Sequence, residues 1–179
     1  MTIKKTLIIL FSVIALILVS CSSENVNSES YSEGSETTNK GPLATDFDLS
    51  DLSGNQVKLS DYEGEKVVLR FWASWCSICL SELDHVNNMT ATAEGYKVFT
   101  IVTPDINGEQ SKDEFITWFE SLEFSDTIVL LDETGDIYDA YGVRGYPTTA
   151  FIGTDGVLSL VLPGPMSQIT VEETLKTIK

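Results

Sequence analysis

Positive charge is scarce in this sequence of 179 residues, which has 11 lysines and arginines against 27 aspartates and glutamates. The formal net charge is −16 at pH 7, and no basic stripe occurs along the chain. Proteins that bind nucleic acid attract the phosphate backbone through clustered lysine and arginine. The composition therefore argues against a nucleic-acid partner, and we interpret the acidity as a source of solubility.

Metal-binding side chains are also few. The chain has three cysteines and one histidine, His85, so the second Cys or His pair that completes a structural zinc site does not occur. His85 follows Cys79 by six positions on what we predict to be one helix, where we expect a solvated surface residue. We therefore predict no metal site and no bound cofactor.

The longest hydrophobic run, Leu7–Val19, is shorter than the roughly 20 residues that a membrane-spanning helix needs. It follows Lys4 and Lys5 and leads into Leu18-Val-Ser-Cys21. A charged start, an apolar middle and small residues at a cleavage point predict an export signal over residues 1–20. A permanent transmembrane helix is the weaker alternative.

The end of this signal, Leu18-Val-Ser-Cys21, resembles the lipobox of bacterial lipoproteins. The resemblance implies that Cys21 becomes the new N-terminus and carries a lipid, which would anchor the chain at the outer face of the cytoplasmic membrane. A plain secretory signal with a fortuitous cysteine is the alternative. Residues 22–40 are dominated by Ser, Glu, Asn and Thr, so we expect a flexible tether over residues 21–42 and a folded domain over residues 43–179.

Cys76 and Cys79 form a Cys-x-x-Cys pair. A disulfide between them closes too small a loop to stabilise the fold much, so redox or metal chemistry is favoured. Lys66–Trp72 predicts a buried strand, and apolar residues recur at helical spacing over residues 77–94. Cys76 then lies at a helix N-terminus, which stabilises a thiolate. We predict that Cys76 is the nucleophile and Cys79 the resolving thiol.

This order of strand, Trp75-Cys-Ser-Ile-Cys79 and helix resembles the redox site of the thioredoxin superfamily. Tyr146-Pro-Thr-Thr149 is similar to the loop that carries the cis-proline of that family. The resemblance covers residues 43–179. It implies an α/β thioredoxin fold, with a central mixed β-sheet flanked by helices, and a cis peptide bond before Pro147.

Three residues near the cysteine pair are predicted to contact the substrate. The resemblance implies that the loop of Tyr146 and Pro147 offers backbone hydrogen bonds to an extended segment of the client. The Trp75 side chain, next to the nucleophile, would add an apolar contact surface. Plain packing within the domain is the alternative role for this tryptophan.

Within the superfamily, the chain looks more like membrane-tethered extracytoplasmic thiol reductases than like cytosolic thioredoxin. Ala44–Leu59 is similar to their added N-terminal β-hairpin, with a turn at residues 53–55. Glu82, three residues after Cys79, matches the glutamate beside their cysteine pair. Arg70 stands where cytosolic thioredoxins have a buried aspartate, so we hypothesise that Glu82 takes over proton transfer near Cys79; a solvated glutamate is the alternative. We expect Arg70 to form a structural ion pair, and a role in lowering the pKa of the nucleophilic thiol is the alternative.

The remaining sequence alternates strand-like and helix-like segments, and no internal repeat occurs. The expected strands lie at residues 97–102, 127–131, 148–152 and 157–162. The expected helices lie at residues 112–121, 133–141 and 170–178.

The resemblance implies an enzyme, a reductase that passes electrons from a membrane-embedded thiol carrier to exported client proteins. Cys-Ser-Ile-Cys is similar to the motif of surface thioredoxins that serve methionine sulfoxide reductases, which favours that client. The alternatives are cytochrome c maturation, a disulfide-forming oxidase, and a redox-inactive copper-binding module. A thiol peroxidase is disfavoured because the Pro-x-x-x-Thr-x-x-Cys signature is absent.

Overall fold

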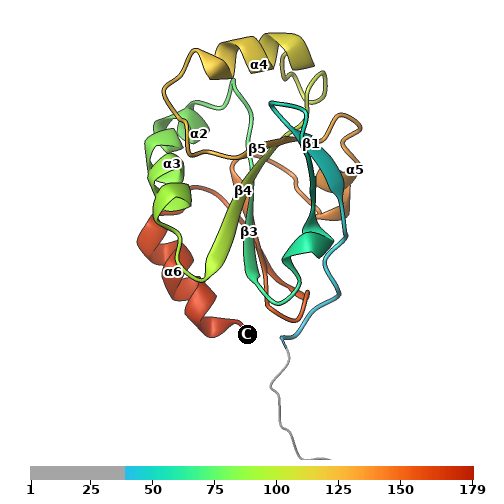
Figure 1. Ribbon diagram of the computed structural model, residues 1–179, viewed down its shortest axis with the longest axis vertical. Helices are drawn as coiled ribbons and strands as arrows, with labels where there is room; N and C mark the ends of the chain where they lie inside the picture. The colour runs from blue at the N-terminus through green and yellow to red at the C-terminus, as the bar shows by residue number, and fades with distance from the viewer. Residues whose placement is uncertain (1–38) are drawn as a thin grey trace, which may run out of the picture. The chain divides into compact units, whose positions relative to one another are not determined.

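The structure, a computed structural model, describes residues 39–179 (Figure 1). The predicted signal peptide, Cys21 and most of the predicted tether lie outside the described residues. Within residues 39–179, none of the helices is long and apolar enough to cross a membrane.

The described strands form one seven-stranded mixed sheet in the order β2-β1-β5-β4-β3-β6-β7. Their bounds are β1 (Asp48–Asp51), β2 (Gln56–Lys58), β3 (Lys66–Phe71), β4 (Tyr96–Val102), β5 (Val129–Leu131), β6 (Thr148–Ile152) and β7 (Leu158–Pro163). Strand β3 is parallel to β4 and antiparallel to β6. The strand that leads into the cysteine pair is therefore hydrogen-bonded on both edges, which fixes its position.

Helices cover the two faces of this sheet. Their bounds are η1 (Leu59–Tyr62), α2 (Ser77–Ser81), α3 (Leu83–Thr92), α4 (Lys112–Glu120), α5 (Asp136–Ala140) and α6 (Gln168–Thr177). Figure 1 shows α3 and α6 together on one side of the sheet, α5 on the other, and α4 beyond the end where β3 leads into α2. The predicted α/β arrangement, a mixed sheet flanked by helices, is confirmed.

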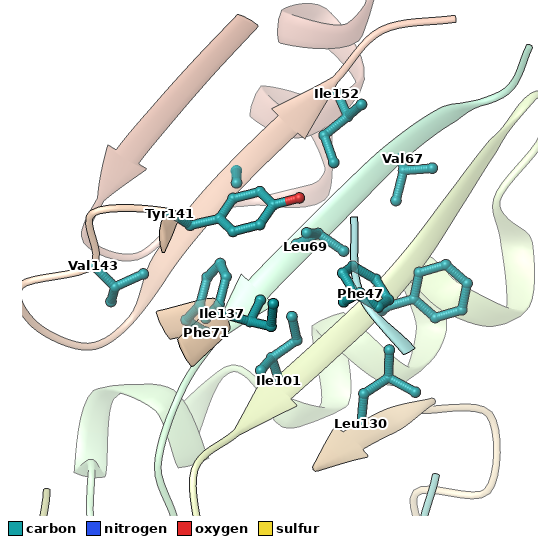
Figure 2. Packing of buried hydrophobic residues seen from close by; sticks show 12 residues of the cluster. Phe47, Val67, Leu69, Phe71, Ile101, Leu130, Ile137, Tyr141, Val143 and Ile152 are labelled. Carbon is teal, nitrogen blue, oxygen red and sulfur yellow. The ribbon is translucent and has the colours of Figure 1, made fainter. Parts of the chain in front are cut away.

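Strand β3 is buried on both faces because its side chains alternate between two cores. Val67, Leu69 and Phe71 belong to the core under α5, together with Tyr141 (Figure 2). Val68 points the other way and packs with residues of α3 and α6. This double burial explains why the sequence of β3 is a near-continuous apolar run.

The first helix differs from the expected continuous helix over residues 77–94, because it is broken at Glu82 into α2 and α3. Glu82 has φ −106° and ψ −3°, outside regular helical geometry. Its side chain is held by Arg70 and by the backbone N–H of Met166. The break thus coincides with contacts to parts of the chain that lie far away in sequence.

The predicted N-terminal hairpin is confirmed by the antiparallel pairing of β1 with β2.

The helix expected at residues 133–141 is shorter in the structure, because residues 132–135 form a turn before α5 begins. Asp132 stabilises this turn by accepting hydrogen bonds from the N–H groups of Gly135, at 3.0 Å, and Tyr138, at 2.9 Å. Burial raises the pKa of the Asp132 carboxyl group, and these hydrogen bonds oppose that shift.

Replacing Ser167 with alanine is expected to lower the free energy of unfolding by about 1 kcal/mol. The Ser167 hydroxyl accepts a hydrogen bond from the Thr170 N–H at 3.2 Å and so caps α6. Urea unfolding of the two chains measures the difference. Ser167→Asp should retain most of the stability, because aspartate also caps helices; equal losses for alanine and aspartate would contradict the capping role.

Candidate active site

Strand β3 delivers the cysteine pair to the start of α2. The Cys76 N–H donates to the carbonyl of Ala73 at 3.1 Å, which closes the turn after the strand. Cys76 is then the N-cap of α2, and the Cys79 N–H donates to its Sγ at 3.2 Å. A backbone donor aimed at this sulfur would also favour the thiolate after reduction.

Cys76 and Cys79 form a disulfide, with Cα atoms 5.2 Å apart. Both residues are buried, with Cys76 7% and Cys79 3% exposed, so Cys76 is the less buried of the two. Behind the pair lies a buried apolar cluster that includes Trp72, Leu83 and Phe115. Cys76 and Cys79 both belong to this cluster.

An aromatic surface lies beside the pair. Trp75 is 54% exposed, and its ring centroid is 5.7 Å from that of Tyr146. The Tyr146 ring lies 5.7 Å from Tyr138, and its hydroxyl is 3.1 Å from the Thr103 hydroxyl oxygen. These contacts fix the Tyr146 side chain, so the loop that it opens has a defined position next to Trp75.

The peptide bond between Tyr146 and Pro147 is cis, as the sequence resemblance implied. The Pro147 carbonyl accepts a hydrogen bond from the Gly164 N–H at 2.7 Å and is therefore already engaged. Within residues 39–179, the Tyr146 backbone makes no such bond. Of the two, Tyr146 is thus the residue with backbone groups available to a ligand.

Arg70 and Glu82 form a buried ion pair on the α3 side of β3. Their side chains are 3% and 14% exposed. Burial lowers the pKa of the Arg70 guanidinium, and the Glu82 carboxylate opposes this shift. The ion pair expected for Arg70 is confirmed, with Glu82 as its partner. The second Glu82 oxygen accepts from the Met166 N–H at 3.0 Å, so the proton-transfer role of Glu82 stays a prediction.

Glu109 is a buried acidic residue near the cysteine pair that the sequence did not predict, and it lies in the segment between β4 and α4. Its carboxylate accepts a hydrogen bond from the Ser74 N–H at 2.6 Å. Periodicity carries no signal for such a contact, because 35 residues separate the two partners along the chain. The same segment packs on the active site, since a Cβ atom on Gly108 would lie 3.6 Å from Nε1 of Trp75.

Potential metal ligands do not gather in the described part of the chain. Among residues 39–179, there is no group of three or more His, Cys, Asp or Glu side chains that could hold a metal ion. His85 lies on α3, and its side chain is exposed.

Comparison with known proteins supports the same chemistry. The AhpC/TSA family profile matches residues 41–161. The thiol-disulfide oxidoreductase ResA of Bacillus subtilis is 30% identical over 146 residues, which cover 82% of this chain and 79% of ResA.

Two solved structures extend this comparison. The exposed lipoprotein thioredoxin of Streptococcus pneumoniae is 43% identical, with a TM-score of 0.73 over 75% of this chain and 100% of that one. A putative thiol:disulfide interchange protein DsbE from Chlorobium tepidum is 29% identical, with a TM-score of 0.66 over 79% of this chain and 98% of that one. These matches confirm the predicted thioredoxin fold. The chain belongs to the AhpC/TSA family and is a thioredoxin-like thiol–disulfide oxidoreductase.

Proposed function

We propose that this chain reduces disulfides in exported proteins, with Cys76 as nucleophile and Cys79 as resolving thiol. The observation that carries the proposal is the position of Cys76, which caps α2, receives the Cys79 N–H at its sulfur and is the more exposed cysteine. The roles rest on the N-cap position, because the thiolate is the attacking form and a backbone donor aimed at the Cys76 sulfur favours it.

The reaction starts from the reduced pair. The Cys76 thiolate attacks one sulfur of the client disulfide, and the other client sulfur leaves as a thiolate. The Cys79 thiolate then attacks Sγ of Cys76, releases the second client thiolate and forms the Cys76–Cys79 disulfide. Two electrons have passed to the client, and a membrane-embedded dithiol carrier, itself oxidised to a disulfide, supplies the two electrons that reduce the Cys76–Cys79 pair again.

Client binding would use the aromatic surface beside the pair. Trp75 and Ile78 are 54% and 51% exposed and offer apolar contact area on either side of Cys76. The available backbone groups of Tyr146 suit an extended client segment, which would pair with them as an added strand.

The proposal includes the location of the chain and the identity of the client protein. The lipobox-like sequence ending at Cys21, together with the likeness to a pneumococcal lipoprotein thioredoxin, supports a lipid anchor at the outer face of the cytoplasmic membrane. Residues 1–20 would be removed, and residues 21–42 would tether a domain over residues 43–179. We propose methionine sulfoxide reductase as the client, on the similarity of Cys-Ser-Ile-Cys to the motif of thioredoxins that serve it.

The reduction potential of the pair decides the direction of electron flow. A reductase should have a potential near that of thioredoxin, about −270 mV. Equilibration of the Cys21→Ser chain with defined dithiothreitol ratios measures this value for the pair alone. A potential near about −120 mV would instead make the chain a disulfide donor and overturn the reductase assignment.

A further inference from the structure

A buried carboxylate that the proposed thiol chemistry does not use lies next to the turn that carries Cys76. Glu109 is 8% exposed, and its oxygens accept hydrogen bonds from the N–H and the hydroxyl of Ser74 and from the N–H of Gln110. The Gln110 side chain donates to the same Ser74 hydroxyl at 3.0 Å. The segment between β4 and α4 is thus fastened to the residue two positions before Cys76.

The charge of Glu109 has no counterion among residues 39–179, because the ion pairs of this region do not include it. The other charged groups near the cysteine pair are Arg70 and Glu82, which pair with each other. Asp105, in the same segment as Glu109, is exposed to solvent. Tyr146, whose ring contacts Trp75, is hydrogen-bonded through its hydroxyl, and Tyr138 packs on the Tyr146 ring. Glu109 is therefore the buried, uncompensated negative charge beside the pair.

We propose that Glu109 is a positioning residue that holds the Ser74 turn and makes the Cys76–Cys79 pair more reducing. A Glu109 carboxylate oxygen lies 2.6 Å from the Ser74 nitrogen, and the two residue steps from Ser74 to Cys76 span at most about 7 Å, so the carboxylate lies within about 10 Å of the Cys76 nitrogen. At such a distance a carboxylate opposes a second negative charge in a poorly solvated site. The inference rests on the proposed redox role of the pair.

The effect acts on only one of the two redox states. Reduction adds two electrons to the disulfide and breaks the S–S bond, and each sulfur ends as a thiolate or, after taking a proton from water, as a thiol. The disulfide and the thiols are neutral, so the Glu109 charge penalises only the thiolate form. Its influence on the reduction potential should therefore grow as the pH rises through the thiol pKa.

The test is the reduction potential of Glu109→Gln in the full Cys21→Ser chain, measured well below and well above the thiol pKa. Glutamine keeps the shape of the side chain and one acceptor for the Ser74 N–H but removes the charge. We expect the equilibrium constant for reduction to rise about tenfold at high pH, which is about 30 mV for this two-electron couple, and to change little at low pH. The pH at which the alkylation rate of Cys76 reaches half its maximum should also be lower in the variant than in the wild type.

Asp105→Asn is the matched control, because it removes the same charge from the same segment at an exposed position where solvent screens it. Its potential should follow that of the wild type. Glu109→Ala, which also removes the charge, should shift the potential in the same direction as Glu109→Gln even if glutamine disturbs the fold.

Two outcomes would overturn the inference. A Glu109→Gln potential that equals the wild-type value at high pH, or that shifts equally at every pH as a structural defect would, excludes the charge effect while leaving the redox pair intact. A wild-type chain with no reversible two-electron transition overturns this inference and the proposed function together.

Discussion

Replacing Cys79 with serine should leave client proteins covalently attached to Cys76 as mixed disulfides. Cys76 is the less buried residue of the pair and can still attack, whereas the resolving thiol that would release the client is gone. Turnover should fall below detection, since each molecule stops after one attack. Non-reducing electrophoresis of cell-envelope extracts, followed by mass spectrometry of the trapped peptide, measures the attachment.

The matched controls separate the roles of the two cysteines. Cys76→Ser should lose turnover as completely but trap much less client, because the remaining Cys79 is shielded and 3% exposed. The double variant should trap none through this pair. Equal trapping by the two single variants would show that the assignment of nucleophile and resolving thiol is wrong.

Replacing Arg70 with leucine should lower the free energy of unfolding by about 3–5 kcal/mol, the usual cost of breaking a buried ion pair by removing one partner. The Glu82 carboxylate would be left largely buried, with the Met166 N–H as its remaining partner. Urea unfolding of the wild type and the variant measures the difference.

A double variant provides the internal control for this loss. Arg70→Leu combined with Glu82→Leu should recover much of the stability, because apolar side chains of similar volume often replace a buried ion pair at little cost. Lys112→Ala, which breaks the exposed pair with Glu133, should have a far smaller effect. If Arg70→Leu is no more destabilising than Lys112→Ala, the buried ion pair does not contribute to stability as predicted.

Patterns that are local in sequence allowed the scaffold of the site to be predicted. The apolar run of β3 and the helical spacing after Cys76 place the cysteine at a helix N-terminus, and the structure shows Cys76 as the N-cap of α2. The hairpin of β1 and β2 follows from its turn residues and from family resemblance. The cis bond at Pro147 came from resemblance alone, because position in the sequence does not distinguish it.

Contacts between distant residues escaped sequence analysis. At the helix break, Glu82 accepts a hydrogen bond from the N–H of Met166, which lies 84 positions later. The spacing of apolar residues within one helix cannot predict a contact with so distant a residue. Arg70 was expected to form an ion pair, but the sequence offers many acidic residues as possible partners. The fold brings Glu82 to it. Glu109 gave no signal because its partner, Ser74, is 35 residues away.

The most direct test of the redox pair is mass analysis of the peptide that contains Cys76 and Cys79, after equilibration of the full chain across a series of redox buffers. We expect one reversible two-electron transition in which this peptide gains two hydrogens, together with loss of disulfide reduction in the Cys76→Ser chain. A peptide that stays oxidised across the range where thioredoxin-type pairs titrate, while Cys76→Ser keeps its activity, would contradict it.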